Sequence, residues 1–402
     1  MQGPLEGVRV IDLTSMISGP LSTMMLADQG ADVIKVEAPS GDHSRRVATR
    51  RNGYSASFLN NNRNKRSIVI DLKKPQGLEV LQTLIQEADV FVQNFRPGVA
   101  KRLGIGENAL RAIKPDLIYV SICGFGLDGP YAQKPVFDPL IQAVSGLTTV
   151  QAGSDQQRPR LVRTIVPDKL TAIQTSQAVT AALYAKLKHG NGQHITISML
   201  DTVVYFLWSS DMGGHTFIGD ELTQETAQSY IDLVYETADG YISVAVVADK
   251  DWAGLAKALE RPDFLTDERF SNAALREENK DARTRLTQEA LLTYNSIDVL
   301  QRLENLDVPC APVLTRQQMI QHEQIQANET LILADHPVAG PLRQARQPAR
   351  FSVSGHKNIT PAPALGQHTC EVLQQAGFTD DTISSLLNNS AVVQAQTPVT
   401  TD

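Results

Sequence analysis

The most constraining feature of this sequence is its repeated alternation of apolar strands and helices. Residues 8–13 form an apolar run, and a turn, the apolar segment 21–29 and a second run at 32–37 follow. This order is typical of a βαβ unit. It continues with strands predicted at 67–72, 89–93 and 117–122. Such alternation predicts a doubly wound parallel sheet, in which ligands bind at the carboxyl ends of the strands.

The pattern changes after residue 227. Residues 236–240 have the composition of a hairpin turn and lead into a strand at 241–246, and charged helical segments follow at 251–259 and 276–294. We therefore predict a smaller α+β domain over residues 228–320. The last residues, 390–402, are polar, and we expect them to be frayed.

Charge and cysteine content exclude several classes of protein. Among 402 residues, 37 are basic and 44 are acidic, which gives a net charge of −7 and no basic footprint for nucleic acid. No apolar run approaches membrane-spanning length, and the N-terminus lacks the pattern of a signal peptide. The three cysteines, Cys123, Cys310 and Cys370, are too widely spaced to indicate disulfides or a zinc site. We expect a metal-free cytoplasmic protein without a membrane partner.

The segment 163–169 precedes a long predicted helix. Residues 170–187 carry an apolar stripe at intervals of three and four, which indicates a helix. Asp168, just after Pro167, would lie at the start of that helix, where the macrodipole favours negative charge. One interpretation is that Asp168 caps the helix. The other is that it is a carboxylate nucleophile for an activated acyl group.

Three further features of the sequence have a functional and a purely structural interpretation. Residues 124–129 match GxGxxG after a strand, but the next segment, 130–135, has two prolines and cannot open the helix of a dinucleotide site. Residues 94–98 follow a strand and supply an amide, an aromatic ring and a guanidinium, a set that suits a phosphorylated, adenine-bearing ligand. Cys123 lies in an apolar strand and is expected to be buried filler.

Taken together, these motifs resemble the class III CoA-transferases. The resemblance covers nearly the whole chain and rests on residues 5–12 (LEGVRVID), 19–20 (GP), 30–37 (GADVIKVE), 94–98 (NFRPG), 124–126 (GFG), 129–131 (GPY), 137–138 (FD), 168–169 (DK), 192–194 (GQH), 198–201 (SMLD) and 363–369 (PALGQHT). Each motif is weak by itself, but their order along the chain is specific.

The resemblance implies a large Rossmann-like domain made from both chain ends, residues 1–227 and 321–402, with the small domain between them. It also implies an interlocked homodimer and no permanently bound cofactor, with CoA thioesters as substrates. The family's nucleophile falls on Asp168. Its CoA-binding positions fall on Ile17, Ser18, Ile70, Asp71, Leu72, Lys73, Asn94, Phe95, Arg96, Arg102, Lys134, Phe137 and Asp138.

The activity implied is transfer of CoA from an acyl-CoA, such as succinyl-CoA, to a free carboxylic acid through an aspartyl anhydride and an aspartyl-CoA thioester. Backbone N–H groups after Pro167, or within 124–129, are candidate oxyanion donors. Two departures stand out, because formyl-CoA transferase has Gln at the position of Ile17 and Arg at that of Ala38. Its glycine-rich small-domain loop also has no clear counterpart here.

Two alternatives remain open at this point. An α-methylacyl-CoA racemase needs an acid–base pair, and its His falls at the position of Phe137. A catalytically silent CoA-binding protein would keep the fold alone. The sequence does not identify the acids, although Arg45, Arg46 and Arg163 are candidate partners for a distal carboxylate.

Overall fold

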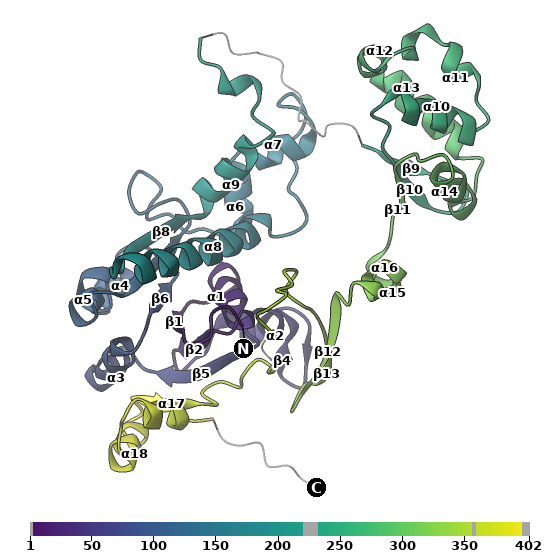
Figure 1. The fold of residues 1–402 in the computed structure, drawn as a ribbon. Helices are drawn as coiled ribbons and strands as arrows, with labels where there is room; N and C mark the ends of the chain where they lie inside the picture. The colour runs from purple at the N-terminus through teal and green to yellow at the C-terminus, as the bar shows by residue number, and fades with distance from the viewer. Residues whose placement is uncertain (1–2, 220–231, 356–358, 396–402) are drawn as a thin grey trace. The chain divides into compact units, whose positions relative to one another are not determined.

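The computed structural model describes residues 3–219, 232–355 and 359–395, and Figure 1 shows their elements. The chain divides into two compact units. One contains residues up to 225 together with those from 330 onward, and the other contains residues 226–329. The small domain predicted at 228–320 falls within the second unit.

The first unit is built on a seven-stranded, mostly parallel sheet. Its strands are β1 (Arg9–Leu13), β2 (Asp32–Glu37), β5 (Lys65–Ile70), β6 (Val90–Gln93), β7 (Ile118–Cys123), β8 (His194–Ser198) and β14 (Val392–Val393). They lie side by side in the order β14-β5-β2-β1-β6-β7-β8. All neighbours are parallel except β14, which runs antiparallel to β5. The predicted parallel sheet of an α/β protein is confirmed.

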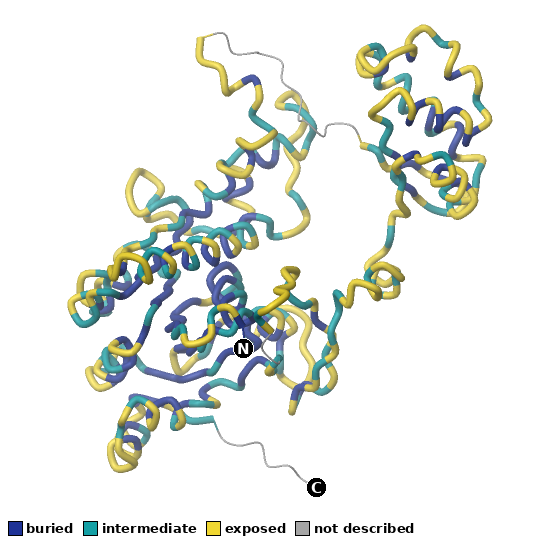
Figure 2. Tube along the Cα trace, in the orientation of Figure 1, coloured by how far each residue is buried: buried dark blue, intermediate teal, exposed yellow. Residues whose placement is uncertain are grey.

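Helices cover both faces of this sheet, whose strands are almost entirely buried (Figure 2). Successive residues of a strand face opposite sides. Val10 of β1 packs with the apolar side chains of α1 (Ser18–Asp28) and α8 (Val166–His189). Ile11, the next residue, packs with those of α3 (Pro75–Gln86), α17 (Thr369–Gln375) and α18 (Asp380–Asn388). Burial on both faces explains why the strands read as almost continuous apolar runs.

Strand order reverses direction at β1. The chain moves outward from β1 through β2 to β5, and then returns to the other side of β1 with β6, β7 and β8. In open parallel sheets, the crevice beside such a reversal is where ligands bind, because the loops on its two sides diverge. Here the loops that flank the reversal are 14–17, after β1, and 94–98, after β6. The topology therefore predicts that a ligand binds beside these two loops.

Shorter elements complete the first unit. Before α8 lie the segments α2 (Ala56–Asn61), α4 (Val99–Arg102), α5 (Glu107–Ile113), α6 (Asp138–Val144) and α7 (Leu147–Ala152), and after it lies α9 (Met199–Trp208). Two hairpins are formed by β3 (Arg50–Arg51) with β4 (Tyr54–Ser55), and by β12 (Leu331–His336) with β13 (Gly340–Ala345).

The C-terminal segment corrects one expectation. Residues 390–402 were expected to be frayed, yet Val392 and Val393 pair with Ile70 and Val69 of β5. The hydroxyl of Thr369 also donates to the Val393 carbonyl at 2.7 Å. Two valines in a polar tail carry little periodicity, so their strand is decided by the free edge of β5 and not by local sequence.

The second unit has its own core. A three-stranded sheet of β9 (Val234–Glu236), β10 (Tyr241–Val244) and β11 (Cys310–Pro312) packs with helices around Trp252, Phe264 and Phe270. The core helices are α10 (Asp249–Ala258), α11 (Asp263–Thr266), α13 (Lys280–Leu291) and α14 (Ser296–Glu304). The unit also contains α12 (Ala273–Glu278), α15 (Arg316–Gln321) and α16 (Glu323–Ala327). Among the described residues of both units, no helix is long and apolar enough to cross a membrane.

Candidate active site

Asp168 lies inside the first turn of α8. The helix begins at Val166, its N-cap residue is Ile165, and no side chain caps it. Pro167 falls in the first two helical positions, where its fixed φ and missing N–H are tolerated. The capping interpretation of Asp168 is therefore wrong, because the helix starts earlier than its apolar stripe indicated. The carboxylate still lies close to the positive end of the helix dipole.

The carboxyl group of Asp168 is held between two elements. Burial, and to a lesser extent the nearby carboxylate of Asp138, raise its pKa to about 6, although hydrogen bonds from the hydroxyl and the backbone N–H of Ser18 oppose that rise. Ser18 is the first residue of α1, and α1 packs along α8. A carboxylate with this pKa is mostly ionised at neutral pH yet only partly solvated, which suits a nucleophile.

Asp138 contacts the backbone of Asp168. It is 3% exposed, at the start of α6, and its Oδ2 accepts the backbone N–H of Asp168 at 3.2 Å. Its Oδ1 accepts from Gln142 Nε2 at 2.7 Å, and Gln142 Oε1 in turn accepts from the Val162 N–H at 3.0 Å. The contacts that Asp138 makes fix the segment that leads into α8, and its predicted role in binding CoA stays a prediction.

Exposed cations gather on the loops at the carboxyl edge of the sheet. Lys73 follows β5, Arg96 follows β6, and Arg102 ends the short helix α4. All three are exposed, and none forms an ion pair with a carboxylate in the described part of the chain. Uncompensated cations at this edge suit the phosphates of a nucleotide such as CoA.

The remaining predicted CoA-binding positions differ in what they can offer. Ile70 is buried in the sheet core, Leu72 and Phe95 pack against that core, and Asp71 bonds through its backbone to Ala391. Phe137 is 67% exposed, and the ammonium of Lys134 lies 3.2 Å from the centre of the Tyr131 ring. The backbone N–H groups of Asp71 and Phe95 are already bonded, to the Ala391 carbonyl and to Gln93 Oε1, whereas Phe137 and Lys134 have accessible side chains.

Both polar atoms of the Asn94 side chain form hydrogen bonds with the loop 14–17. Its Nδ2 donates to the Ser15 carbonyl at 2.8 Å, and its Oδ1 accepts from the Ser15 N–H at 3.0 Å. The loop of Asn94 is itself fixed, because Gln93 Oε1 accepts the Phe95 N–H at 2.8 Å and Gln93 Nε2 donates to Ser121 at 2.9 Å. The side chain of Asn94 thus joins the two loops at the reversal of strand order.

The glycine-rich segment 124–129 forms a loop and not the start of a helix, as expected from its prolines. Gly126 and Gly129 have φ values of 105° and 89°, which other residues rarely adopt. A Cβ at Gly124 would lie 2.5 Å from a methyl carbon of Val136, so this position admits no side chain. Cys123 is buried, as predicted.

Of the three arginines considered for a distal carboxylate, Arg45 is already occupied. Its Nε and one terminal nitrogen bond both carboxylate oxygens of Glu37, at 2.8 and 2.6 Å, and its other terminal nitrogen bonds the Pro363 carbonyl at 3.0 Å. Arg46 donates to the Ser40 carbonyl at 2.5 Å. Arg163 is exposed and pairs with no carboxylate in the described ranges.

Sequence reasoning missed three residues of the site, namely Lys35, Asp42 and Gln142. Lys35 carries a signal that was available, because a lysine inside the apolar run VIKVE must be buried with a partner if the run is a central strand. Asp42 and Gln142 carry no such signal. A cavity of about 620 Å³ lined by Asp32, Arg66 and His336 lies at the opposite, amino ends of β2 and β5 and is not part of this site.

The parallel sheet, the exposed cations at its carboxyl edge and the half-buried Asp168 are features that suit an acyl-group transferase acting on a nucleotide-bearing thioester. The sequence matches CoA-transferase family III over residues 5–369, and the chain belongs to that family of enzymes. It is 31% identical to human succinyl-CoA:glutarate CoA-transferase (98% of this chain, 91% of the relative). It is 33% identical to succinyl-CoA:mesaconate CoA-transferase of Haloarcula hispanica (93% and 97%).

A solved structure agrees with this assignment. The CAIB/BAIF family protein from Brucella suis superposes with a TM-score of 0.83 at 30% identity, covering 94% of this chain and 100% of that one. The similarity in structure therefore extends over both units, and the family match over residues 5–369 includes the segments that carry Ser18 and Asp168.

Proposed function

We propose that this CoA-transferase moves CoA between two dicarboxylic acids, with succinyl-CoA as a donor and Asp168 as the covalent nucleophile. The observation that supports the nucleophile is the half-buried carboxylate of Asp168, with its pKa raised to about 6 and with Ser18 bonding the anion. The relatives named above support the acids, since their names pair succinyl-CoA with glutarate or mesaconate.

The proposed reaction keeps its atoms and charges balanced. An oxygen of Asp168 attacks the thioester carbon, the C–S bond breaks, and an aspartyl–acyl anhydride and CoA thiolate form. The thiolate attacks the aspartyl carbonyl of the anhydride and releases the donor acid as a carboxylate. The acceptor carboxylate attacks the resulting aspartyl-CoA and expels the thiolate. The thiolate then takes the acceptor acyl group and frees Asp168.

Each of these steps passes through an oxyanion, which needs hydrogen-bond donors already in place. The backbone N–H groups of loop 124–129 are the proposed donors. In the first turn of α8, Pro167 has no N–H, and the N–H groups of Val166 and Lys169 already donate to the carbonyls of Thr164 and Ile165. The N–H of Asp168 itself is occupied by Asp138 Oδ2, so this group is excluded from that role.

A racemase is less well supported than acyl transfer. It needs a second group that can exchange a proton across the enolate from its partner. Asp138 is buried, and its two oxygens accept from the Asp168 N–H and from Gln142. Phe137, at the position of the racemase His, has no group that titrates.

The substrate class is tested with a panel of acids. Wild-type protein with succinyl-CoA is expected to form the CoA thioesters of other dicarboxylic acids, followed by mass spectrometry, and to react poorly with monocarboxylic acids of equal length. The proposal assigns the distal carboxylate to Arg163. Backbone carbonyls on both sides of Arg163, those of Val162 and Thr164, accept from Gln142 Nε2 at 3.4 and 3.3 Å, which holds it near the Asp138–Asp168 segment.

Arg163→Gln is therefore expected to raise KM for glutarate about 10- to 100-fold, because a charge-assisted hydrogen bond contributes about 1.5–3 kcal/mol. KM for pentanoate should change little. Arg158→Gln, at an exposed arginine of the same loop, is the matched control. Equal losses for both acids, or no loss for either, would contradict the role of Arg163.

The proposal extends to an interlocked homodimer. Ile173 of α8 and Tyr205, Phe206 and Trp208 of α9 are each at least 47% exposed, and they line a groove of about 570 Å³. Contiguous exposed apolar groups of this kind mark an interaction surface, and a second copy of the chain is the proposed occupant.

Sedimentation at nanomolar concentration is expected to give twice the chain mass of 43.9 kDa. Tyr205→Asp should shift the protein toward monomer and lower its Tm, because it places a charge in the covered groove. Ile297→Asp, at a residue of α14 that is 79% exposed, should do neither. A stable wild-type monomer would end this part of the proposal.

A further inference from the structure

The loop between β1 and α1 has a backbone that must be held in place. It contains Thr14, Ser15, Met16 and Ile17, and it leads directly to Ser18. Met16 has a φ of 71°, in the left-handed region that residues with a side chain rarely adopt. Such a conformation persists only where the surroundings determine it.

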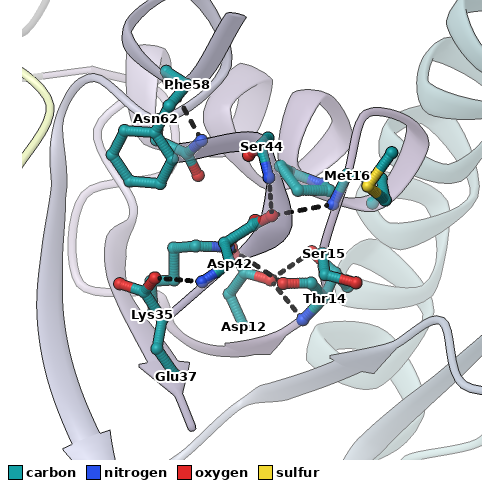
Figure 3. Close-up of polar contacts among 12 residues, drawn as sticks. Asp12, Thr14, Ser15, Met16, Lys35, Glu37, Asp42, Ser44, Phe58 and Asn62 are labelled. Carbon is teal, nitrogen blue, oxygen red and sulfur yellow. Dashed lines mark hydrogen bonds and ion pairs between the residues drawn. The ribbon is translucent and has the colours of Figure 1, made fainter. Parts of the chain in front are cut away.

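The buried ion pair between Lys35 and Asp42 contacts the backbone of this loop (Figure 3). Asp42 Oδ1 accepts the backbone N–H of Met16 at 3.1 Å, and Asp42 Oδ2 lies 3.0 Å from Lys35 Nζ. The same Nζ donates to the Thr14 carbonyl at 2.9 Å. The Lys35 and Asp42 side chains are 0% and 1% exposed, so neither can exchange its partner for water.

Further charges surround this pair. Lys35 is also faced by Asp12 and Glu37, and Asp12 is paired with Lys65 Nζ at 2.9 Å. Asp12 Oδ1 accepts from the Thr14 N–H at 3.0 Å, which adds a third contact to the loop. Buried ion pairs contribute little stability compared with apolar groups of the same shape. Their value here is geometric, because several of their bonds end on the backbone of the same loop.

The side chain of Asn94 also holds the loop 14–17. The two hydrogen bonds between Asn94 and the backbone of Ser15 fix it to the loop after β6. Consecutive residues 14, 15 and 16 are therefore each bonded to a different side chain, and residue 18 bonds the carboxylate of Asp168.

We propose that Lys35, Asp42 and Asn94 are positioning residues, which hold the loop 14–17 so that Ser18 keeps its hydrogen bonds to Asp168. This inference rests on the proposed role of Asp168 as nucleophile. None of the three positioning residues needs to touch substrate. The negative charge of Asp138, in α6, raises the pKa of Asp168, and the hydrogen bonds from Ser18, in α1, lower it.

Asp42→Asn is the first test. Asn keeps an oxygen for the Met16 N–H but loses the negative charge that Lys35 requires. Loss of the Ser18 hydrogen bonds favours protonated Asp168, so the acid limb of kcat/KM should move from about pH 6 to higher pH, by roughly half to one unit. Activity at pH 7 should fall about 10-fold or more.

Asp28→Asn is the matched control. Asp28 forms a buried ion pair with Arg63 at 2.6 Å in the same unit, at the far end of α1 from Ser18. It should lower Tm without moving the acid limb. A folded Asp42→Asn protein with the wild-type limb and rate would overturn the proposal.

Asn94→Ala supplies a second test that does not disturb a buried charge. If Asn94 positions the loop, the acid limb should shift in the same direction as in Asp42→Asn. If Asn94 instead binds CoA, KM for the thioester should rise with the limb unchanged, and this result would also overturn the proposal.

The pKa of Asp168 can also be measured without turnover, by an infrared titration of its carboxyl group. The signal is the difference between each protein and its Asp168→Asn derivative, and the pKa should rise in the two variants. A wild-type protein that transfers no CoA would refute the proposed function, whereas an unshifted titration in both Asp42→Asn and Asn94→Ala would refute the positioning role alone.

Discussion

Asp168→Asn is expected to lower CoA transfer by roughly 10³-fold or more while the protein stays folded. Asn has nearly the same shape and leaves the backbone N–H of residue 168 free to bond Asp138, but it lacks the anionic oxygen that must attack the thioester. Steady-state transfer from succinyl-CoA to glutarate, measured beside Asp155→Asn on an exposed loop, checks this expectation.

The same substitution has a defined effect on stability. The folded pKa of Asp168, about 6, is above the unfolded value of about 3.9, so the folded state binds more protons between those two values. Stability therefore falls as pH rises through that window, and the loss is complete above pH 6. Asp168→Asn removes this loss, and Tm at pH 8 should equal or exceed that of wild type, by the equivalent of about 1–3 kcal/mol. Below pH 4 the difference should vanish.

A trapping experiment separates covalent from non-covalent roles of Asp168. Wild-type protein given succinyl-CoA without an acceptor should accumulate a CoA adduct, and hydroxylamine or borohydride should mark the peptide that contains Asp168. The Asp168→Asn protein should give no such peptide. Full activity in this variant, or an adduct on a different residue, would refute the nucleophile.

Gly19→Ala is the second substitution expected to have a large effect. Gly19 follows Ser18 in α1, and a Cβ there would lie 2.4 Å from Thr14 Cβ, well inside contact distance. Thr14 cannot retreat, because its hydroxyl bonds the buried Asp12 at 2.5 Å. The clash must displace α1 or the loop before it, at a cost of roughly 1–3 kcal/mol. A displacement of Ser18 by about 1 Å should lower kcat about 10²-fold.

Gly106→Ala is the control for this prediction. Gly106 also lies at a helix start, with a φ of −65° that alanine can adopt, and its Cβ would meet no atom closer than 3.4 Å. Thermal unfolding and kcat should both stay near wild type. If Gly19→Ala behaved like Gly106→Ala, the close packing of α1 on Thr14 would have no role in catalysis.

Some parts of the fold could be predicted and others could not. The strands at 32–37 and 89–93 and the helix of Asp168 were visible, because apolar periodicity is a local property. The first turn of α8 could not be predicted, since residues 163–167 carry no apolar stripe and Pro167 is typical of a helix boundary. The pairing of β14 with β5 joins residues more than 300 positions apart, which no local pattern encodes.

The candidate site divides in the same way. Asp168 and the cations Arg96 and Arg102 could be named because their motifs occur in order along the chain. The ion pair between Arg45 and Glu37, and the hydrogen bonds between Asn94 and Ser15, could not be predicted from the sequence. An arginine or asparagine looks the same in sequence whether its side chain is free or already bonded.

By itself, the sequence determined the alternation of strands and helices, the sheet edge that carries the ligand loops, and membership in a family of CoA-transferases. These properties follow from the residue types and their spacing along the chain. Only the tertiary structure decided that Asp138 and Ser18 meet at Asp168, and that Lys35 and Asp42 lie beneath the loop before Ser18. The reason is physical: a pKa or a hydrogen bond depends on distances of a few ångströms, and those distances arise when separate strands and helices pack together.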